Sequence, residues 1–290
     1  MSSKPPRNHS QTITDYLMLQ RSRIREDGST DSYKFAFEDD AFLARPETIG
    51  LRFQLELLKP EILLHERRID HTITVFGSTR FVSHDTAVEM GRKAKTPAEL
   101  AEANTALSHS QYYDSAREFG AIVARYNATQ SESKNKLHIA TGGGPGIMEA
   151  ANRGAFEAGD KTIGFNISLP REQYPNPYVS EGLSFRFHYF ALRKMHFMLR
   201  ARAIVAYPGG FGSMDELFEV LTLMQTKKVI RFPVILVGKD FWTEVVSFKK
   251  MLEHGVIEQA DVDLIHFVET AEAAWGVIRD WYQLAFKSNL

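Results

Sequence analysis

The chain has 290 residues, of which 43% are hydrophobic, so it is long enough to form one large domain with a buried core, which argues against wholesale disorder. Its net charge of -1 gives no sign of a nucleic-acid partner, and the absence of cysteine excludes disulfides, thiolate zinc sites and a thiol nucleophile. No apolar run is long enough to cross a membrane and the N-terminus lacks the apolar core of an export signal, so we expect a cytoplasmic protein without a membrane partner.

Residues 1–69 are predicted to form an N-terminal extension, and residues 70–290 the main domain. Residues 1 to about 45 are polar and mixed in character, and we interpret them as a partly disordered arm. Four apolar residues then recur at helical spacing: Leu51, Leu55, Leu58 and Ile62. Pro60 should kink or split this helix, which we expect to pack on the main domain or on a second subunit.

Strands and helices alternate from residue 71 onward, and the predicted strands are continuous apolar runs: 72–78, 137–141, 161–169, 203–210, 232–238 and 263–270. Helical patterns cover 114–127, the segment after the glycines at 142–146 with Gly159 as its C-terminal cap, 188–201, 213–225, 241–255 and 271–286. Such strands are typical of a parallel sheet covered on both faces. We therefore predict a Rossmann-like, doubly wound α/β domain that binds its ligand outside the carboxyl ends of the strands.

One segment interrupts this alternation. Residues 82–113 are polar and rich in alanine, and we interpret them as an inserted helical excursion near the predicted ligand edge. It could serve as a lid or as a surface elaboration, and we favour the elaboration.

Three strand ends carry glycine, at 76–80, 141–152 and 208–216. Glycine lets backbone N–H groups approach an anion, and a following helix adds unpaired donors and the positive end of its dipole. Each turn alone could serve only close packing, but three on one sheet edge indicate a phosphate site. The turns match neither a dinucleotide fingerprint nor a Walker A loop, so neither NAD nor ATP is indicated. The predicted phosphate-binding residues are Gly77, Ser78, Gly142, Gly143, Gly144, Gly146, Gly209, Gly210, Gly212 and Ser213.

Charged residues flank the last of these turns. Asp215 and Glu216 are expected in the first turn of a helix capped by Ser213, where stabilisation of the helix dipole is a sufficient reason for Asp215. A carboxylate beside a phosphate is repelled by it, so Glu216 better fits chemistry on a neighbouring sugar carbon that gains positive charge. Arg193 and Lys194 precede the strand that enters this turn and offer cations for phosphate or carboxylate.

The sequence "GGGPGIMEAANRGA", followed by "LRK" and then, fifteen residues after Arg193, by the proline of "PGGFGSMDE", resembles the Lonely Guy (LOG) family of nucleoside 5'-monophosphate phosphoribohydrolases, which are often labelled lysine decarboxylases. The resemblance covers roughly residues 70–290. It implies a Rossmann-like homodimer or larger assembly that takes a small nucleotide, AMP or a cytokinin riboside monophosphate, and releases the free base and ribose 5-phosphate.

The family's catalytic arginine corresponds to Arg193 and its catalytic glutamate to Glu216, with Lys194 among the substrate-binding residues. Ser213 stands where the family usually has threonine, and Asp215 where plant members have glutamate. The His-Glu that precedes Arg-Lys in the plant enzymes is missing, which leaves the base open. The histidines show no paired metal-ligand spacing, and we expect neither a metal nor a cofactor.

Two other functions stay open. The chain could be a non-hydrolytic nucleotide- or cofactor-binding carrier, as related proteins are for molybdenum cofactor, although retention of both Arg193 and Glu216 counts against it. A pyridoxal phosphate decarboxylase needs a Schiff-base lysine, and only Lys194 is suggestively placed. Three aromatic residues could stack on a purine or belong to the core: Phe190, Tyr207 and Phe211.

Overall fold

The computed structural model describes residues 34–169 and 174–283, and the chain divides into two compact units, Met1–Arg52 and Phe53–Leu290. Residues 1–33 of the predicted arm lie outside the described residues. The boundary that we place at residue 69/70 stays a prediction.

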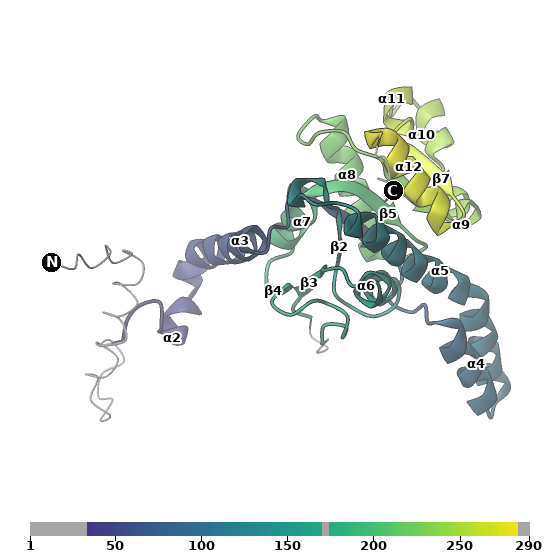
Figure 1. Cartoon of the computed structure of the whole chain (residues 1–290), viewed down its shortest axis with the longest axis horizontal. Helices are drawn as coiled ribbons and strands as arrows, with labels where there is room; N and C mark the ends of the chain where they lie inside the picture. The colour runs from purple at the N-terminus through teal and green to yellow at the C-terminus, as the bar shows by residue number, and fades with distance from the viewer. Residues whose placement is uncertain (1–33, 170–173, 284–290) are drawn as a thin grey trace. The chain divides into compact units, whose positions relative to one another are not determined.

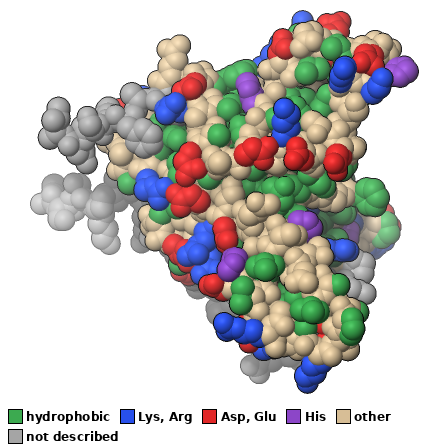
Figure 2. Space-filling model, turned by 90° about the vertical axis from the view of Figure 1, so that its right-hand side faces the viewer, with side chains coloured by type: hydrophobic (Ala, Val, Ile, Leu, Met, Phe, Trp, Pro, Cys, Tyr) green, Lys and Arg blue, Asp and Glu red, His purple; other side chains and the backbone are tan. Residues whose placement is uncertain are grey.

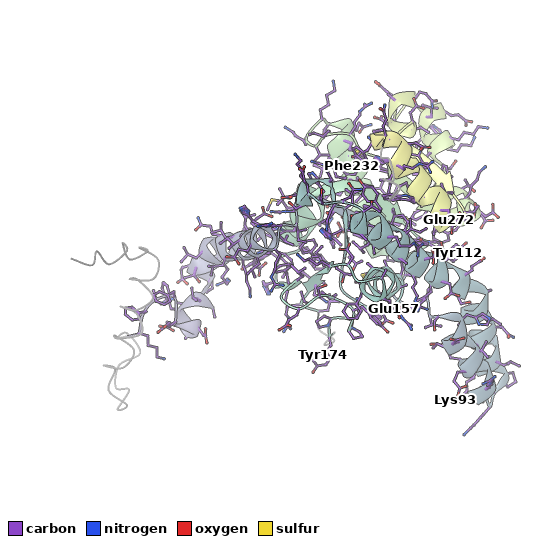
Figure 3. All side chains as sticks on the ribbon, viewed as in Figure 1. Lys93, Tyr112, Glu157, Tyr174, Phe232 and Glu272 are labelled. Atoms are coloured by element: carbon purple, nitrogen blue, oxygen red, sulfur yellow. The ribbon has the colours of Figure 1, made fainter. Side chains whose placement is uncertain are left out.

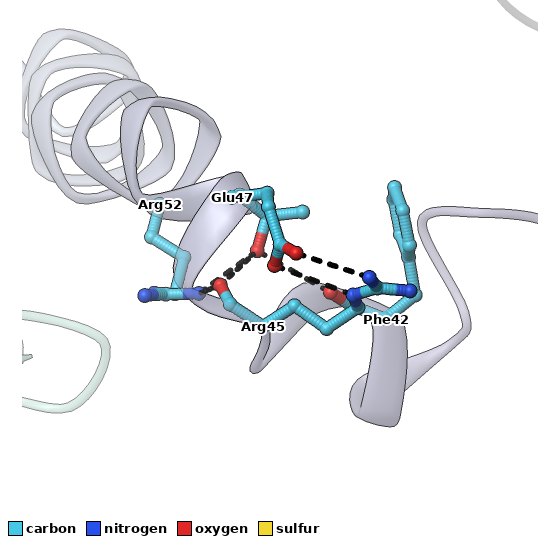
Figure 4. A network of polar contacts seen from close by, with 5 residues as sticks. Phe42, Arg45, Glu47 and Arg52 are labelled. Atoms are coloured by element: carbon cyan, nitrogen blue, oxygen red, sulfur yellow. Dashed lines mark hydrogen bonds and ion pairs between the residues drawn. The ribbon is translucent and has the colours of Figure 1, made fainter.

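The described part of the first unit contains the short helix α2 (Asp40–Leu43), the 3-10 turn η2 (Pro46–Thr48) and the start of helix α3 (Ile49–Glu66). The guanidinium of Arg52 ties these pieces together, because it donates to the carbonyl oxygens of Leu43 and Arg45 and to the hydroxyl of Thr48, the last two over 2.8 and 2.9 Å. Figure 4 shows Arg52 beside Arg45. An ion pair of 3.1 Å between Arg45 and Glu47 closes the same turn.

Helix α3 contains Pro60 in its interior and continues to Glu66, so of the expected kink or split, the split does not occur. Proline lacks the N–H that would bind the carbonyl oxygen of Glu56 four residues earlier. Nε2 of His196 donates to that oxygen instead, over 3.2 Å. The helix therefore tolerates the proline because its free carbonyl has another donor.

The second unit is built on one parallel sheet of seven strands in the order β4-β3-β2-β1-β5-β6-β7 (Figure 1), which confirms the predicted α/β Rossmann-like fold. The strands are β1 (Thr72–Phe76), β2 (His138–Thr141), β3 (Thr162–Ile167), β4 (Ser184–Phe187), β5 (Ala201–Ala206), β6 (Val234–Val237) and β7 (Ile265–Val268). Every residue of β1 is buried, as expected for the centre of a sheet covered on both faces.

Helices pack on both faces of the sheet. One core cluster joins inward-facing strand residues to the helices α5 (Pro97–Ala128), α6 (Ile147–Glu157) and α12 (Ala271–Tyr282). The other joins the opposite strand faces to α3, α7 (Phe190–Leu199), α8 (Phe211–Gln225), α9 (Lys239–Val245) and α10 (Phe248–Glu253). Ile73 and Phe76 of β1 are three residues apart and face opposite sides of the sheet, and they belong to different clusters, so the strand contributes to both cores.

Three elements differ from the sequence prediction. Strand β4 was not predicted, because its buried and exposed residues alternate over only four positions. The helix expected over 241–255 is two helices, α9 and α10, since Ser247 caps the second by accepting from the N–H of Lys250. The excursion at 82–113 is helical, as expected, but it forms α4 (His84–Lys93) and the first half of α5, which continues without a break through 114–127.

One smaller feature follows the sequence closely. Gly159 follows α6 with a φ of +83°, as the predicted C-terminal cap requires. The 3-10 turn η3 (Ser133–Asn135) and the short helix α11 (Gln259–Val262) complete the described elements.

Among the described residues, no helix is both long and apolar enough to cross a membrane. Basic and acidic side chains are interspersed on the face of the molecule shown in Figure 2.

Candidate active site

The chain changes direction across the sheet at β1, which has β2 on one side and β5 on the other. Ligands of doubly wound sheets bind at such a switch point, outside the carboxyl ends of the strands. The three predicted glycine turns follow β1, β2 and β5, so all of them lie at this edge.

The turn after β1 contacts both of the others. The N–H of Ser78 donates to the carbonyl oxygen of Pro208 over 2.9 Å, and the carbonyl oxygen of Ser78 accepts from the N–H of Ile147 over 3.0 Å. A Cβ added to Gly146 would lie 2.3 Å from that same oxygen. Gly146 also has a φ of +71°, so both space and backbone conformation require glycine here.

A buried asparagine network holds the turn after β2. The backbone N–H of Asn176 donates to the carbonyl oxygen of Gly143 over 2.8 Å, and its Nδ2 donates to that of Gly144 over 3.1 Å. The same Nδ2 reaches Oδ1 of Asn152 over 3.0 Å, which also accepts from the hydroxyl of Thr141 over 2.7 Å. Asn176 was not predicted from the sequence, because nothing in its local pattern reveals a partner 32 residues away.

The turn after β5 leads directly into α8. This helix begins at Phe211, with Gly210 as an N-cap that makes no side-chain bond. Ser213 is therefore not the cap that we expected, and Asp215 and Glu216 lie beyond the first turn, which contains no acid. The helix starts earlier because Gly212 is helical, and the N–H groups of Ser213 and Met214 both donate to the carbonyl oxygen of Gly210.

Ser213 nevertheless lies against the glycines. A Cβ added to Gly209 would lie 2.1 Å from Oγ of Ser213 and 3.2 Å from the carbonyl carbon of Gly77. The hydroxyl thus lies beside the β5 turn at the point where it meets the β1 turn. Of the predicted residues, Gly210 and Gly212 have no neighbour within 4 Å of an added Cβ, so their backbone is open.

Glu216 is almost fully enclosed, with 8% of its surface exposed. Burial raises the pKa of its carboxyl to about 7, against the opposing charges of Arg193 and Lys194, while Glu219 and Asp215 raise it further. A carboxyl with such a pKa exchanges its proton near neutral pH, which is what a general acid or base requires.

Arg193 lies against the turn after β2. Its Nε donates to the carbonyl oxygen of Phe165 over 2.7 Å, and a Cβ added to Gly142 would lie 2.4 Å from its Nη2. Burial lowers the pKa of Arg193 and the charge of Glu216 raises it. The two predicted catalytic side chains therefore interact electrostatically, with the guanidinium placed over the glycine turn.

Lys194 points instead to α8. Its ammonium forms ion pairs with Asp215 over 2.7 Å and Glu219 over 2.9 Å. Burial lowers the pKa of Lys194, but the hydrogen bonds that its ammonium donates to these two carboxylates outweigh burial, and the pKa is raised overall. Lys194 thus ties α7 to α8, and its contact with a phosphate stays a prediction.

The three aromatic residues that could stack on a purine, Phe190, Tyr207 and Phe211, differ in how far they are buried. Tyr207 is fully buried, with its hydroxyl 3.3 Å from that of Ser115, so it belongs to the core. Phe190 is half-exposed, and Phe211 is 95% exposed at the start of α8. Phe211 is thus an exposed aromatic side chain directly beside the glycine turn.

A hollow of about 450 Å³ lies between α5 and α12, where Figure 3 labels Tyr112 and Glu272. Five carboxylates line it: Asp114, Glu118, Asp240, Glu269 and Glu272. They would repel a phosphate, so this hollow does not compete with the glycine turns as a phosphate site. Within the described residues, no group of three or more His, Asp or Glu side chains is arranged to hold a metal ion.

Comparison with known proteins points to one family. The family described as "Possible lysine decarboxylase" matches residues 148–278. A relative from Arabidopsis thaliana, cytokinin riboside 5'-monophosphate phosphoribohydrolase LOG3, is 27% identical over 170 residues, which are 56% of this chain and 72% of the relative.

Solved structures also resemble the chain. A structural-genomics target determined by X-ray crystallography is 23% identical, with a TM-score of 0.47 over 72% of this chain and 99% of that one. The molybdenum cofactor binding protein of Rippkaea orientalis is 18% identical (TM-score 0.47, 73% of this chain and 96% of that one). The molybdenum cofactor carrier protein of Chlamydomonas reinhardtii is 19% identical (TM-score 0.38, 74% and 98%).

Proposed function

Because the chain belongs to the LOG family, we propose that it hydrolyses the N-glycosidic bond of a purine nucleoside 5'-monophosphate, AMP or a cytokinin-type nucleotide, to the free base and ribose 5-phosphate. The observation that carries the proposal is the buried carboxyl of Glu216, whose pKa is raised to about 7 and which interacts electrostatically with the guanidinium of Arg193. Both belong to helices at the edge of the sheet where the glycine turns meet.

In this mechanism the bond between the sugar carbon and the base nitrogen breaks, and the base leaves with the electron pair. Positive charge develops on the sugar ring, and the ionised carboxylate of Glu216 stabilises it. A water oxygen then bonds to the sugar carbon, and Glu216 takes the proton that this water loses. Arg193 binds the substrate beside the turn after β2. The departing base takes up one proton from the solvent, and Glu216 releases the proton it took from the water, so the carboxylate is restored and the reaction balances as nucleotide plus water to base plus ribose 5-phosphate.

The glycine turns provide the phosphate site in this proposal. Backbone N–H groups and the start of α8 offer donors without side chains in the way. Binding of the remote 5'-phosphate lowers the barrier at the sugar carbon, so a nucleoside without it should react poorly.

The charges around Lys194 argue against a pyridoxal phosphate decarboxylase. A lysine that forms a Schiff base must lose its proton, and enzymes lower its pKa for that purpose. Two carboxylates within 2.9 Å do the opposite to Lys194 and raise its pKa.

The test is a panel of nucleoside 5'-monophosphates and the matching nucleosides, incubated with the protein, with free base measured by chromatography. We expect base from at least one purine monophosphate and a Glu216→Gln variant slower by about 10²–10⁴-fold. Glu244→Gln, an exposed carboxyl on α9, is the matched control and should keep the parent rate.

Equal rates for the parent and Glu216→Gln would show that the role given to the glutamate is wrong. Calorimetric binding of AMP with no free base after long incubation would instead support a carrier. A homodimer and a cytoplasmic location are parts of the same proposal, which sedimentation and cell fractionation would test.

A further inference from the structure

Helix α7, which carries Arg193, begins without a cap of its own. Its N-cap residue is Tyr189, whose side chain makes no capping bond, and its first turn contains no acid. The first N–H groups of a helix have no partner inside the helix and need one from elsewhere.

Glu56 of α3 supplies a partner for the N–H of the N-cap residue Tyr189 and for that of the residue before it. One carboxylate oxygen of Glu56 accepts from the N–H of His188 over 2.9 Å, and the other accepts from the N–H of Tyr189 over 3.2 Å. A negative charge at this end also suits the helix dipole. The ring of Phe53, one turn earlier on α3, packs edge-on against that of Tyr189, with 4.2 Å between their centroids.

The capped residue is bonded directly to the backbone of Arg193. The carbonyl oxygen of Tyr189 accepts from the N–H of Arg193 over 3.2 Å, which is the first hydrogen bond of this helix. The Glu56 carboxylate thus fixes the peptide group on one side of Tyr189, and Arg193 is bonded to the peptide group on the other side.

The main chain of Glu56 holds the same helix at a second point. Its carbonyl oxygen, left free by Pro60, accepts from Nε2 of His196. The His196 ring is buried and packs against the ring of Phe165. The carbonyl oxygen of Phe165 accepts the hydrogen bond from Nε of Arg193. One residue of α3 therefore contacts α7 both at its start and one turn beyond Arg193.

We propose that Glu56 is a positioning residue: its carboxylate caps α7 from outside and thereby keeps the Arg193 guanidinium against the glycine turn after β2. The effect of Glu56 on catalysis rests on the proposed function, whereas the effect of Glu56 on the position of Arg193 does not. Glu56 lies in the N-terminal extension predicted from the sequence, so this role gives that extension a part in the site.

The first test needs no ligand. In protein labelled for NMR at arginine side chains, the Nε–H of Arg193 is identified by its loss in Arg193→Lys, and its exchange with water is measured. We expect exchange about tenfold faster in Glu56→Ala, since a charge-assisted bond is lost at the start of the helix. Glu56→Gln should be intermediate, because its amide keeps one acceptor oxygen and much the same volume.

The matched control is Glu66→Ala, which removes an exposed carboxyl from the same helix and should leave Arg193 as in the parent. Unchanged exchange in both Glu56 variants would overturn the proposal. So would equal acceleration in Glu66→Ala.

The second test uses turnover. Glu56→Ala should lower kcat/KM for AMP about tenfold in the parent and leave it unchanged in an Arg193→Ala background, because the effect passes through Arg193. An equal loss in both backgrounds would contradict the proposal. If the parent releases no base from any nucleotide, the proposed function fails, and the exchange measurement alone decides the role of Glu56.

Discussion

The carboxyl of Glu216 is less stable as an anion in the folded protein than in the unfolded chain. Its pKa is raised from the ordinary value of 4.5 to about 7, chiefly by burial. A shift of this size corresponds to about 3 kcal/mol between the two protonation states. Folding therefore favours the neutral form, and stability is lost as the pH rises from about 4.5 through about 7.

Glu216→Gln should remove this pH dependence, because glutamine resembles the protonated form. We expect the variant and the parent to have similar free energies of unfolding at pH 5, and the variant to be more stable above pH 7, by up to about 3 kcal/mol. Urea unfolding at several pH values measures this, with Glu244→Gln as the control. A parent that is the more stable protein at pH 8 would contradict the raised pKa.

Some features of the candidate site have a local signal in the sequence. The glycine turns are visible because glycine clusters after apolar runs, and the catalytic roles assigned to Arg193 and Glu216 beside them stay predictions. The first turn of α8 was placed wrongly because its glycines look like loop. Asn176 and Glu56 were missed because their partners are main-chain atoms far along the chain, which a local pattern does not reveal.

At the scale of elements, continuous apolar strands were predicted and the short alternating strand β4 was not. It pairs with β3 at the end of the sheet, where only one strand neighbour is available and exposed residues such as Arg186 are tolerated. Pro60 was expected to kink or split α3, and the split does not occur. A proline inside a helical pattern normally indicates a break, and only the tertiary contact with His196 explains its presence in α3.

Pro60→Ala tests this explanation. Removing a proline from a helix interior should gain about 3 kcal/mol, but here we expect less than about 1 kcal/mol, since the Glu56 carbonyl already has a donor. In a His196→Phe background that carbonyl loses its donor, and Pro60→Ala should gain about 1 kcal/mol more. Urea unfolding of the four proteins gives the coupling, and equal gains in both backgrounds would refute it.

At the scale of the molecule, the fold class was predictable because the order of apolar strands and amphipathic helices is a property of the whole sequence. The division of the chain into two compact units at residue 52/53 is harder to predict from the sequence. Both core clusters draw their residues from the second unit, beginning with Leu57 and Leu64 of α3, although α3 itself starts in the first unit. The helical pattern does not show where one compact unit ends inside a continuous helix.

Two truncations distinguish these boundaries. A chain that begins at Arg45 should keep the thermal transition of the full chain within about 2 °C, because it retains both core clusters. A chain that begins at Asp70 loses Leu64 and Ile69 from the core and should unfold at least about 5 °C lower. Equal transitions for the two truncations, measured by circular dichroism, would place the boundary at residue 69/70.

The position of β1 has a consequence for the growing polypeptide. Strand β2 is the next strand to be synthesised after β1 and can pair with it early. The other neighbour of β1, β5, is synthesised only after β3 and β4. Until then one side of a strand whose residues are all buried in the folded protein has unpaired N–H and C=O groups, which can pair with strands of other chains. A ribosome that stalls before β5 would therefore release a fragment prone to aggregate. A truncated messenger RNA that ends there would yield a product that needs chaperones.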